Sequence, residues 1–285
     1  MSLSCGESVA LIIPALNEAE SLRLLLPELA SFGLKQIIVV DNGSSDETAR
    51  VARDLGASVV CEPRKGYGQA CWRGVEAATD LGAEILIFMD GDGSDDPADL
   101  PAMLIPLYEQ RADLVMGSRV TRRAEAGAVP LQARLGNWFV SHLLNLMYRT
   151  SLHDVGSFRV VRRASLQALQ MREMTFGWPV EMLVKSARAS YHIVEVPLHY
   201  RKRKAGHSKV AGTLVGSVRA AWSMLHTTFR YAGRPFLSQA RDPQRRRGEF
   251  AQSQPGSPNG VPVSAPGEAL VPNTWWKRVV RRRYA

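Results

Sequence analysis

The sequence predicts an α/β fold in which helices cover both faces of a mostly parallel β-sheet. Through the first 117 residues, short β-branched runs alternate with segments whose apolar residues recur at helical spacing. The runs are apolar at nearly every position, which is typical of strands buried on both faces. Polar, glycine-containing motifs follow these runs directly. In open sheets of this kind ligands bind beyond the carboxyl ends of the strands, so we expect a ligand site there.

The elements follow from these patterns in order. Strands are expected at 9–13, 37–40, 58–61, 85–89 and 113–116. Helices are expected between them at 20–31, 46–55, 67–81 and 98–111. The second part is less regular, with helices expected at 131–149, 179–189 and 213–231 and strands at 158–161 and 193–196.

We expect one α/β domain over residues 1–237, with a first half at 8–118 and a second half at 119–237. After Leu237 the hydrophobic periodicity ends, and Gln, Pro, Gly, Ser and Arg dominate through Asn273. This composition is typical of disorder. Residues 238–285 are therefore expected to be a disordered linker followed by a basic and aromatic tail.

The net charge of +9 is unevenly distributed. Residues 1–199 hold 19 Lys and Arg against 24 Asp and Glu, whereas 200–237 hold eight basic and no acidic residues and 238–285 hold nine basic and three acidic. This pattern favours an anionic surface or substrate over a DNA-binding domain, so no nucleic-acid partner is expected.

The cellular compartment is predicted from cysteines and hydropathy. The three cysteines, Cys5, Cys61 and Cys71, form no C-x-x-C pair and imply no disulfide framework. We therefore expect a reducing, cytoplasmic environment. The N-terminus lacks the pattern of a secretory signal, and no run approaches the ~18 apolar residues of a spanning helix.

Asp90-Gly91-Asp92 follows the apolar run at 85–89 directly. Two carboxylates at a strand end suit Mg²⁺ or Mn²⁺, because Mg²⁺ binds through one or two carboxylates plus substrate phosphates. Alone, such a motif is also common in ordinary turns. The motifs upstream decide between these two interpretations.

Three further motifs follow the earlier strands. Pro14-Ala15-Leu16-Asn17-Glu18 is expected to end the first strand at Pro14, and 41–46 follows the second. Asp41 is placed to accept hydrogen bonds from a base or ribose. Ser45 or Asp46 is placed to cap the next helix. Lys65-Gly66 precedes a helix as a phosphate neighbour would. Turn and cap chemistry alone is the alternative explanation.

Together these strand ends predict a site for a nucleoside diphosphate whose diphosphate is a leaving group. The order P-x-x-N-E, D-N-G-S-x-D, K-G-x-G-x-A and D-G-D resembles the family 2 glycosyltransferases of the GT-A fold, which is Rossmann-like. Further motifs resemble the branch of dolichyl-phosphate mannosyltransferases and polyprenyl-phosphate glucosyltransferases, namely Gly117-Ser118-Arg119, 154–159, Glu181, 196–201 and 206–209. The resemblance extends from residue 8 to about 231.

The resemblance implies roles for individual residues. The nucleotide would be bound by Pro14, Leu16, Glu18, Asp41, Lys65, Gly66 and Asp90, and the Mg²⁺ or Mn²⁺ ion by Asp90 and Asp92. The donor pyrophosphate and an anionic acceptor would be surrounded by Arg119, Arg159, Arg201 and Lys209. A solvated basic face is the alternative for these four residues. The catalytic residues would be Asp92, Asp154 and Arg119.

The chain departs from the family pattern at three places. Asp41-Asn42 stands where the family often has two acidic residues. Asp154-Val155-Gly156-Ser157-Phe158-Arg159 is one residue shorter than the D-x-T-S-G-F-R of the mannosyltransferases, and Ser94 replaces a Gln of some relatives. These departures bear on the donor and the acceptor.

The resemblance implies inverting transfer from a UDP- or GDP-sugar, with a polyprenyl phosphate as the expected acceptor. A phosphate acceptor needs no general base, whereas a hydroxyl acceptor needs a carboxylate, for which Asp154 is the candidate. Alternatively, Asp154 holds a nearby Arg or caps a turn. A soluble or polysaccharide hydroxyl acceptor, and a non-catalytic nucleotide-sugar-binding protein, are the alternative functions.

The C-terminal part predicts peripheral attachment to the cytoplasmic face of an anionic membrane. The helix at 213–231 has one apolar face, formed by Leu214, Val218, Ala221, Trp222, Leu225 and Phe229. Two Trp and five basic residues lie within the nine positions 275–283. Trp and clustered Lys or Arg are typical of membrane interfaces. The alternative is a helix packed on the core with an idle tail.

Overall fold

The computed structural model describes residues 8–205 and 214–231, and for 214–221 the backbone alone. All of these lie in one compact unit, Met1–Pro235. The boundary expected at 237, the tail at 238–285 and Lys209 lie outside the described residues.

A seven-stranded sheet with the order β3-β2-β1-β4-β6-β5-β7 forms the centre of the fold. Its strands are β1 Val9–Ala15, β2 Gln36–Asp41, β3 Ser58–Cys61, β4 Ile85–Phe88, β5 Leu114–Ser118, β6 Arg159–Arg162 and β7 Ile193–Pro197. β6 runs antiparallel to both of its neighbours, and the other pairs are parallel. The expected mostly parallel sheet is confirmed.

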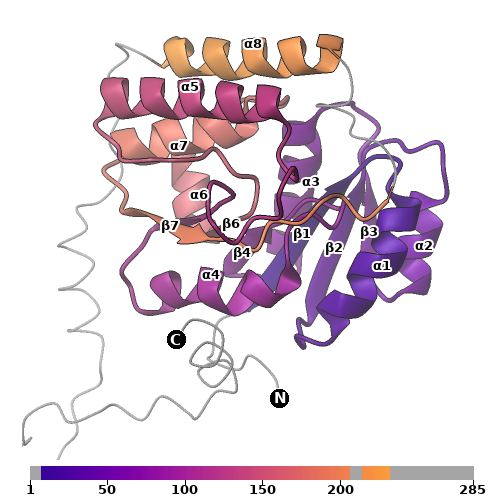
Figure 1. Ribbon diagram of the computed structural model, residues 1–285. Helices are drawn as coiled ribbons and strands as arrows, with labels where there is room; N and C mark the ends of the chain where they lie inside the picture. The colour runs from indigo at the N-terminus through magenta and orange to yellow at the C-terminus, as the bar shows by residue number, and fades with distance from the viewer. Residues whose placement is uncertain (1–7, 206–213, 232–285) are drawn as a thin grey trace, which may run out of the picture. The chain divides into compact units, whose positions relative to one another are not determined.

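Helices cover both faces of the sheet (Figure 1). One apolar cluster joins the sheet to α1 Ala19–Ala30, α2 Thr48–Asp54 and α4 Leu100–Tyr108, which follows a 3₁₀ turn, η1 Pro97–Asp99. The other joins it to α3 Tyr67–Asp80, α5 Leu131–Tyr148, α6 Arg163–Leu169, α7 Trp178–Arg188 and α8 Leu214–Arg230. The short helix α6 was not expected, because seven residues are too few to show helical periodicity.

The strand order creates a switch point between β1 and β4. From β1 the chain proceeds outward to β2 and β3 on one side, and β4 then pairs on the other side of β1. Ligands of open α/β sheets bind at such a point. The motifs after β1, β2 and β4 all lie at this edge.

The expectation that Pro14 ends the first strand is wrong. β1 continues to Ala15, with Pro14 paired opposite Val40 of β2. The Ala15 carbonyl accepts a hydrogen bond from Asn42 N–H on the β2 side. Because the backbone groups of successive strand residues point to opposite sides, those of Pro14 point toward β4. Pairing with β4 has already ended at Ile12, and the missing N–H of proline therefore costs no ladder bond.

After β7 the chain forms an irregular segment, residues 199–205, which we call the strap. In Figure 1 it leaves β7 and crosses in front of β4 and β1 toward α1. Tyr200 forms an isolated antiparallel bridge with Asp95, and the Ala205 carbonyl accepts from Ser21 of α1. The strap thus lies over the carboxyl ends of the central strands.

Candidate active site

Hydrogen bonds lock together the loops after β1 and β2. Asn17 has a positive φ of 52°, and its side-chain oxygen accepts from Ser45 N–H at 2.7 Å, while its own N–H donates to Ser44 Oγ at 2.9 Å. Asp46 accepts from the N–H groups of Ala19 and Thr48, at 3.1 and 3.0 Å. Asp46 therefore ties together the first residues of α2 and α1, although the N-cap position of α2 is Glu47, whose side chain makes no cap hydrogen bond.

Asp41 and Asn42 have different roles. Asp41 Oδ1 accepts from Ser44 N–H at 3.0 Å, and its side chain remains partly exposed at the strand end. Asn42 is buried, and its Nδ2 donates to the carbonyls of Glu62 and Arg64, at 2.9 and 2.7 Å. Its Oδ1 accepts from Gly66 N–H at 2.9 Å. A carboxylate cannot donate to two carbonyls, which explains why an amide replaces an acidic residue here.

Lys65 and Gly66 make contacts within the protein. The Lys65 ammonium donates to the carbonyls of Gly43 and Asn42, at 2.6 and 3.2 Å. A Cβ on Gly66 would lie 2.3 Å from the Met174 carbonyl oxygen, and its φ of 150° also favours glycine. In this conformation Gly66 allows the segment before α7, which contains Met174, to lie close to the backbone of residue 66.

Two other motifs converge on Asp90. Tyr67, next to Gly66, donates from its hydroxyl to Oδ1 at 3.1 Å, and Ser157 donates to Oδ2 at 2.7 Å. Burial, and secondarily the charge of Asp92, raise the pKa of Asp90 above its ordinary value. The loops after β3 and before β6 thus meet the D-x-D motif, although they are separated from it in sequence.

Asp92 and Glu18 share one cation, Arg203 of the strap. Arg203 Nη2 lies 3.1 Å from Asp92 Oδ2, and Nη1 lies 2.7 and 2.8 Å from the two oxygens of Glu18. The other oxygen of Asp92 accepts from the backbone and hydroxyl of Ser94, at 2.9 and 2.6 Å. Ser94, the residue that departs from the family pattern, therefore orients the carboxylate.

Asp95 adds a further buried carboxyl group. It is 1% exposed, and neither of its oxygens has a hydrogen-bond partner among the described residues. Burial, followed by the charges of Asp90 and Asp92, raises the pKa of Asp95 well above its ordinary value.

Asp154 is committed to Arg119. Its Oδ2 accepts from the backbone N–H and Nε of Arg119, at 2.7 and 2.9 Å, and its Oδ1 accepts from Nη2 at 2.8 Å. Asn137 and the Val155 N–H also donate to Oδ1. Burial raises the pKa of Asp154, but the charge and hydrogen bonds of Arg119 outweigh it, and the net shift is downward. The contacts therefore match the alternative in which Asp154 holds an arginine.

The other basic residues assigned to phosphate binding occupy different surroundings. Arg159 is 1% exposed and donates to the carbonyls of Gly156 and Pro179, at 2.8 and 2.6 Å, and burial lowers its pKa to about 10. Arg201 pairs with Asp96 at 2.6 Å and with Glu28 at 3.3 Å. In this conformation Arg159 connects β6 to α7, and Arg201 fastens the strap.

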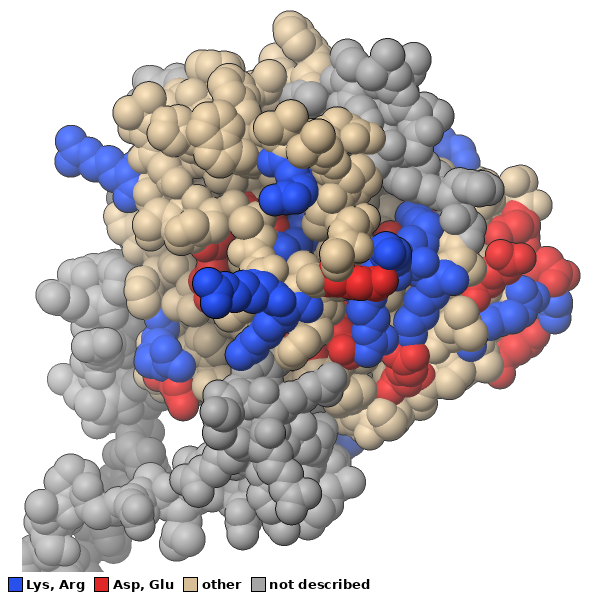
Figure 2. All heavy atoms as spheres, in the orientation of Figure 1, with Lys and Arg blue, Asp and Glu red and all other residues tan. Residues whose placement is uncertain are grey.

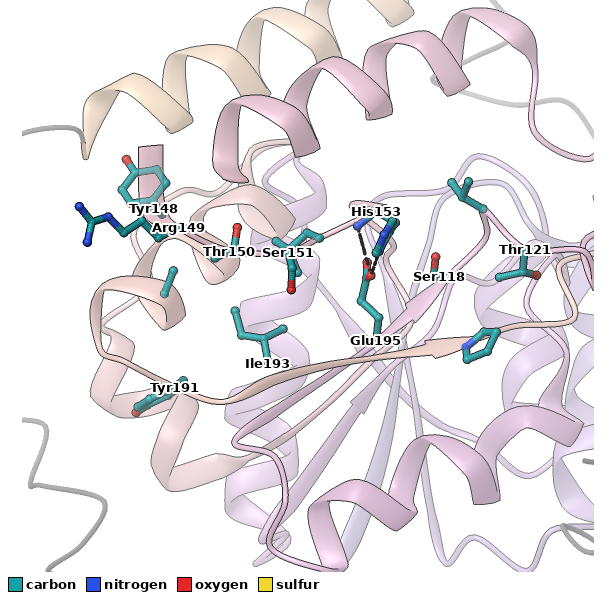
Figure 3. A pocket seen from close by; sticks show the side chains of 14 residues that line it. Ser118, Thr121, Tyr148, Arg149, Thr150, Ser151, His153, Tyr191, Ile193 and Glu195 are labelled. Carbon is teal, nitrogen blue, oxygen red and sulfur yellow. Dashed lines mark hydrogen bonds and ion pairs between the residues drawn. The ribbon is translucent and has the colours of Figure 1, made fainter. Parts of the chain in front are cut away.

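A cavity of about 680 Å³ is lined by Ser118 and Val120, the sequence neighbours of Arg119 (Figure 3). Ser118 and Thr121 line one end, and Tyr148 and Tyr191 line the other. Between them His153 and Glu195 point toward one another, with His153 Nδ1 2.7 Å from Glu195 Oε2. Glu195 also accepts from the N–H groups of His153 and Asp154, so it fixes the turn that carries Asp154.

Sequence reasoning missed Arg203, Tyr67, Ser157 and Asp95. Tyr67 and Ser157 lie inside motifs that the sequence analysis had already identified, which was the available signal. For Arg203 the basic run at 201–204 gave a signal for the segment but not for the residue.

The D-x-D edge fits a divalent cation that also contacts substrate phosphates. Within residues 8–205 and 214–231 no cluster of three or more His, Cys, Asp or Glu side chains forms a complete metal cage. Mg²⁺ usually binds through one or two carboxylates and completes its shell with water and phosphate oxygens. Asp92 already holds one cationic group, the Arg203 guanidinium, which shows that its Oδ2 is placed to receive positive charge.

The chain is similar in sequence to several known proteins. The sequence pattern of Glycosyl transferase family 2 matches residues 10–170. An uncharacterized glycosyltransferase of Mycobacterium tuberculosis is 42% identical over 216 residues, covering 75% of this chain and 95% of that protein. An undecaprenyl-phosphate mannosyltransferase of Micrococcus luteus is 33% identical over 219 residues, covering 73% and 89%.

A solved structure shares the fold. It is the glucosyl-3-phosphoglycerate synthase from Mycobacterium tuberculosis in complex with Mn²⁺, UDP and glucosyl-3-phosphoglycerate. The TM-score is 0.63 at 20% identity, covering 81% of this chain and 82% of that one. At this identity the similarity establishes the fold alone.

Proposed function

Because this chain belongs to glycosyl transferase family 2, we propose that it transfers a sugar from a nucleoside-diphosphate sugar to a polyprenyl phosphate. The chain is a glycosyltransferase with a GT-A-like fold, and the donor, acceptor and metal are the proposed details. The undecaprenyl-phosphate mannosyltransferase of M. luteus supports a lipid-linked phosphate as the acceptor class.

The observation that carries the choice of acceptor is the commitment of Asp154. A hydroxyl acceptor must lose a proton during transfer, which requires a general base within hydrogen-bond reach. Asp154 is the carboxylate expected for that task, but both of its oxygens accept hydrogen bonds, and Arg119 lowers its pKa. A phosphate acceptor is already anionic and needs no base, so these contacts favour it.

The donor would lie across the β1–β4 switch point. Asp41 and Glu18 would contact the nucleoside, and Asp90 and Asp92 would hold Mg²⁺ or Mn²⁺. When bound, the divalent cation would neutralise charge on the departing diphosphate. The complex of the M. tuberculosis synthase with Mn²⁺ and UDP supports both the cofactor class and the nucleotide class.

The protein's own contribution would be positioning and charge. The acceptor phosphate oxygen attacks the anomeric carbon in line, the bond from that carbon to the diphosphate breaks, and the configuration inverts. Arg119 is preorganised by Asp154 and by Tyr200, whose ring centroid lies 5.6 Å from the guanidinium carbon. A guanidinium fixed in this way stabilises phosphate charge without reorganising during the reaction. The cavity lined by Ser118 and Val120, on either side of Arg119 in the sequence, would admit the acceptor.

We further propose that the exposed faces of α5 and α8 contact the membrane that carries the acceptor. An exposed apolar stripe runs along α5, formed by Leu131, Leu135, Trp138, Phe139 and Leu146, each at least half exposed. On α8, Trp222 and Phe229 are 70% and 56% exposed. The two helices lie side by side, and Figure 2 shows this part of the surface largely free of acidic side chains. We call these seven residues the apolar surface.

The orientation of α8 favours this interpretation over a core-packed apolar face. Among the side chains described at 222–231, those of Thr227, Thr228 and Tyr231 on the opposite side are buried. Leu225 is partly buried, and the side chains of Leu214, Val218 and Ala221 lie outside the described residues. Within residues 8–205 and 214–231 no helix is long and apolar enough to cross a membrane. The proposed attachment is peripheral, at the cytoplasmic face.

A donor and acceptor panel tests the proposal. UDP- and GDP-sugars are incubated with Mg²⁺ or Mn²⁺, with and without a polyprenyl phosphate, and released nucleoside diphosphate and glycolipid are measured. Metal-dependent glycolipid formation supports the proposal. Rapid nucleotide release only with a soluble or polysaccharide hydroxyl acceptor would favour the alternative acceptor class. Nucleotide-sugar binding without release would favour a non-catalytic protein.

A further inference from the structure

The strap is fastened directly onto the D-x-D loop. The N–H groups of Arg201 and Lys204 donate to the carbonyls of Ser94 and Asp92, at 2.8 and 3.1 Å. The stem of Lys204 crosses Gly93, where an added Cβ would meet it at 2.8 Å, and Gly93 has a φ of 74°. A side chain at that position would collide with the Lys204 side chain, so the glycine allows this contact.

Ion pairs anchor the strap on both sides of Arg203. Arg201 pairs with Asp96 and Glu28, and the Lys204 ammonium also pairs with Glu28. These contacts leave the Arg203 side chain directed at the carboxylates of Glu18 and Asp92. Its guanidinium binds both, and the side chains of Arg203, Glu18 and Asp92 are only 21%, 8% and 17% exposed. Partly buried carboxylates of this kind are costly to leave without positive charge.

We propose that Arg203 holds the place of the divalent cation in the ligand-free enzyme and is displaced from Asp92 when metal and donor bind together. This inference rests on the proposed function. Arg203 Nη2 is bound to Asp92 Oδ2, so a metal ion at that oxygen must compete with the guanidinium. Guanidinium groups bind phosphate as well as carboxylate, in both cases through paired N–H donors. The donor's diphosphate therefore offers the released Arg203 a new partner.

Two consequences follow from this exchange. The metal alone binds weakly, because it must displace Arg203 with no compensating contact. Metal and nucleoside diphosphate strengthen each other's binding, because the phosphates accept the guanidinium that the metal displaces. Arg203 is in this sense a positioning residue that links the arrival of the metal to the arrival of the donor.

The test measures Mn²⁺ binding to the full-length protein by electron paramagnetic resonance of the free ion, with and without UDP or GDP. For Arg203→Gln we expect Mn²⁺ affinity in the absence of nucleotide to rise roughly tenfold, a coupling of ordinary size. The enhancement of Mn²⁺ binding by nucleotide should shrink. Lys202→Gln is the matched control, because it removes one positive charge from the same strap at a side chain that pairs with Glu125 and is 61% exposed. It should change affinity less than about twofold, since exposed charges are screened.

The outcomes separate this inference from the proposed function. Unchanged or weaker Mn²⁺ binding by folded Arg203→Gln, with normal nucleotide-enhanced binding in the wild type, would overturn the placeholder role alone. No Mn²⁺ binding by the wild type even with both nucleotides would overturn the proposed metal dependence. If Arg203→Gln does not fold, Arg203→Lys replaces it. One ammonium cannot bridge Glu18 and Asp92 as the guanidinium does, so an intermediate gain in affinity is expected, and none would count against the placeholder role.

Discussion

Asp154 accepts three hydrogen bonds from a single residue, Arg119, through its backbone N–H, Nε and Nη2. The Asp154 side chain is 0% exposed and that of Arg119 is 19% exposed. The pair connects the end of β5 to the turn before β6. It fixes the orientation of the Arg119 guanidinium, and the same contacts leave the carboxylate poorly suited to remove a proton.

Asp154→Asn should therefore lower the free energy of unfolding at pH 7 by about 3–5 kcal/mol, because it leaves a buried guanidinium without its charge partner. Folding lowers the pKa of Asp154 below its ordinary value of 3.8. The stabilising contribution is thus present above that value and is lost as the pH falls through the folded-state pKa. Denaturant unfolding at several pH values should show that the difference in unfolding free energy between the wild type and Asp154→Asn shrinks below pH 3.8.

The control for this measurement is Asp54→Asn. Asp54 pairs with Arg50 at the surface, where their side chains are 59% and 58% exposed. Such a pair contributes at most about 1 kcal/mol. Equal unfolding free energies for Asp154→Asn and the wild type at pH 7 would contradict the structural role given to the buried pair.

Asp92→Ala should abolish metal-dependent turnover with little loss of stability. The side chain lies at a partly open strand end, where it orients positive charge and does not pack in the core. Nucleoside diphosphate release with saturating Mn²⁺ measures the loss, and thermal unfolding measures the stability. Turnover close to that of the wild type would remove the basis for a metal at this motif.

Asp41→Ala should raise the KM for the donor and leave kcat nearly unchanged. A contact with the nucleoside exists equally in the ground and transition states, so its loss weakens binding uniformly. A lost hydrogen bond to a charged group costs about 1.5–3 kcal/mol, which corresponds to roughly 10- to 100-fold in KM. Initial rates over a donor series provide the test. A large fall in kcat at constant KM would place Asp41 at the reacting centre instead.

Asn42→Asp should destabilise the fold by at least about 2 kcal/mol. The carboxylate would face the carbonyls of Glu62 and Arg64, to which the amide now donates, and would leave these acceptors unsatisfied. Thermal unfolding compares this variant with Asn42→Ala, which loses the same bonds without adding a charge. The aspartate variant should be the less stable of the two, and the reverse order would show that the charge finds a partner.

The strands and most helices could be predicted because the periodicity of apolar residues that indicates each one lies within a single short stretch of sequence. The loops of the site were also predictable, since each motif follows its own strand. The basic residues were harder to assign. Arg203 contacts Glu18, 185 positions away, and nothing within the run at 201–204 distinguishes it from Arg201, which pairs with Asp96 and Glu28.

Arg159 shows a second reason why the role of a basic residue could not be predicted from the sequence. Its motif indicated a phosphate ligand, but the residue begins β6, which lies between β4 and β5. A side chain in the middle of a covered sheet is buried, and its guanidinium bonds to the Pro179 carbonyl of α7. The antiparallel insertion of β6 depends on contacts between distant segments, so the burial of Arg159 was not readable from its neighbours in sequence.

The apolar surface provides a test of membrane attachment. Replacing Leu135 and Trp138 of α5 by Ser removes two side chains that are 60% and 64% exposed. Burial of each such side chain in the bilayer interface would contribute about 1.5–3 kcal/mol. Binding of the double variant to anionic liposomes, measured by co-sedimentation, should fall at least about tenfold, with donor hydrolysis in water unchanged. Leu24→Ser on α1 is the control, because Leu24 is 51% exposed but lies outside the apolar surface.

Truncation after Leu237 tests the basic tail by the same assay. The tail's Lys and Arg residues should add salt-sensitive affinity for anionic lipid, about 1 kcal/mol for each residue near the surface. The truncated protein should bind anionic liposomes more weakly, and neutral liposomes about as well as the full chain. Equal binding by both proteins would remove the tail from the attachment and leave α5 and α8. If neither protein binds any liposome, the enzyme has no membrane surface, and a soluble hydroxyl acceptor becomes the better explanation of its active site.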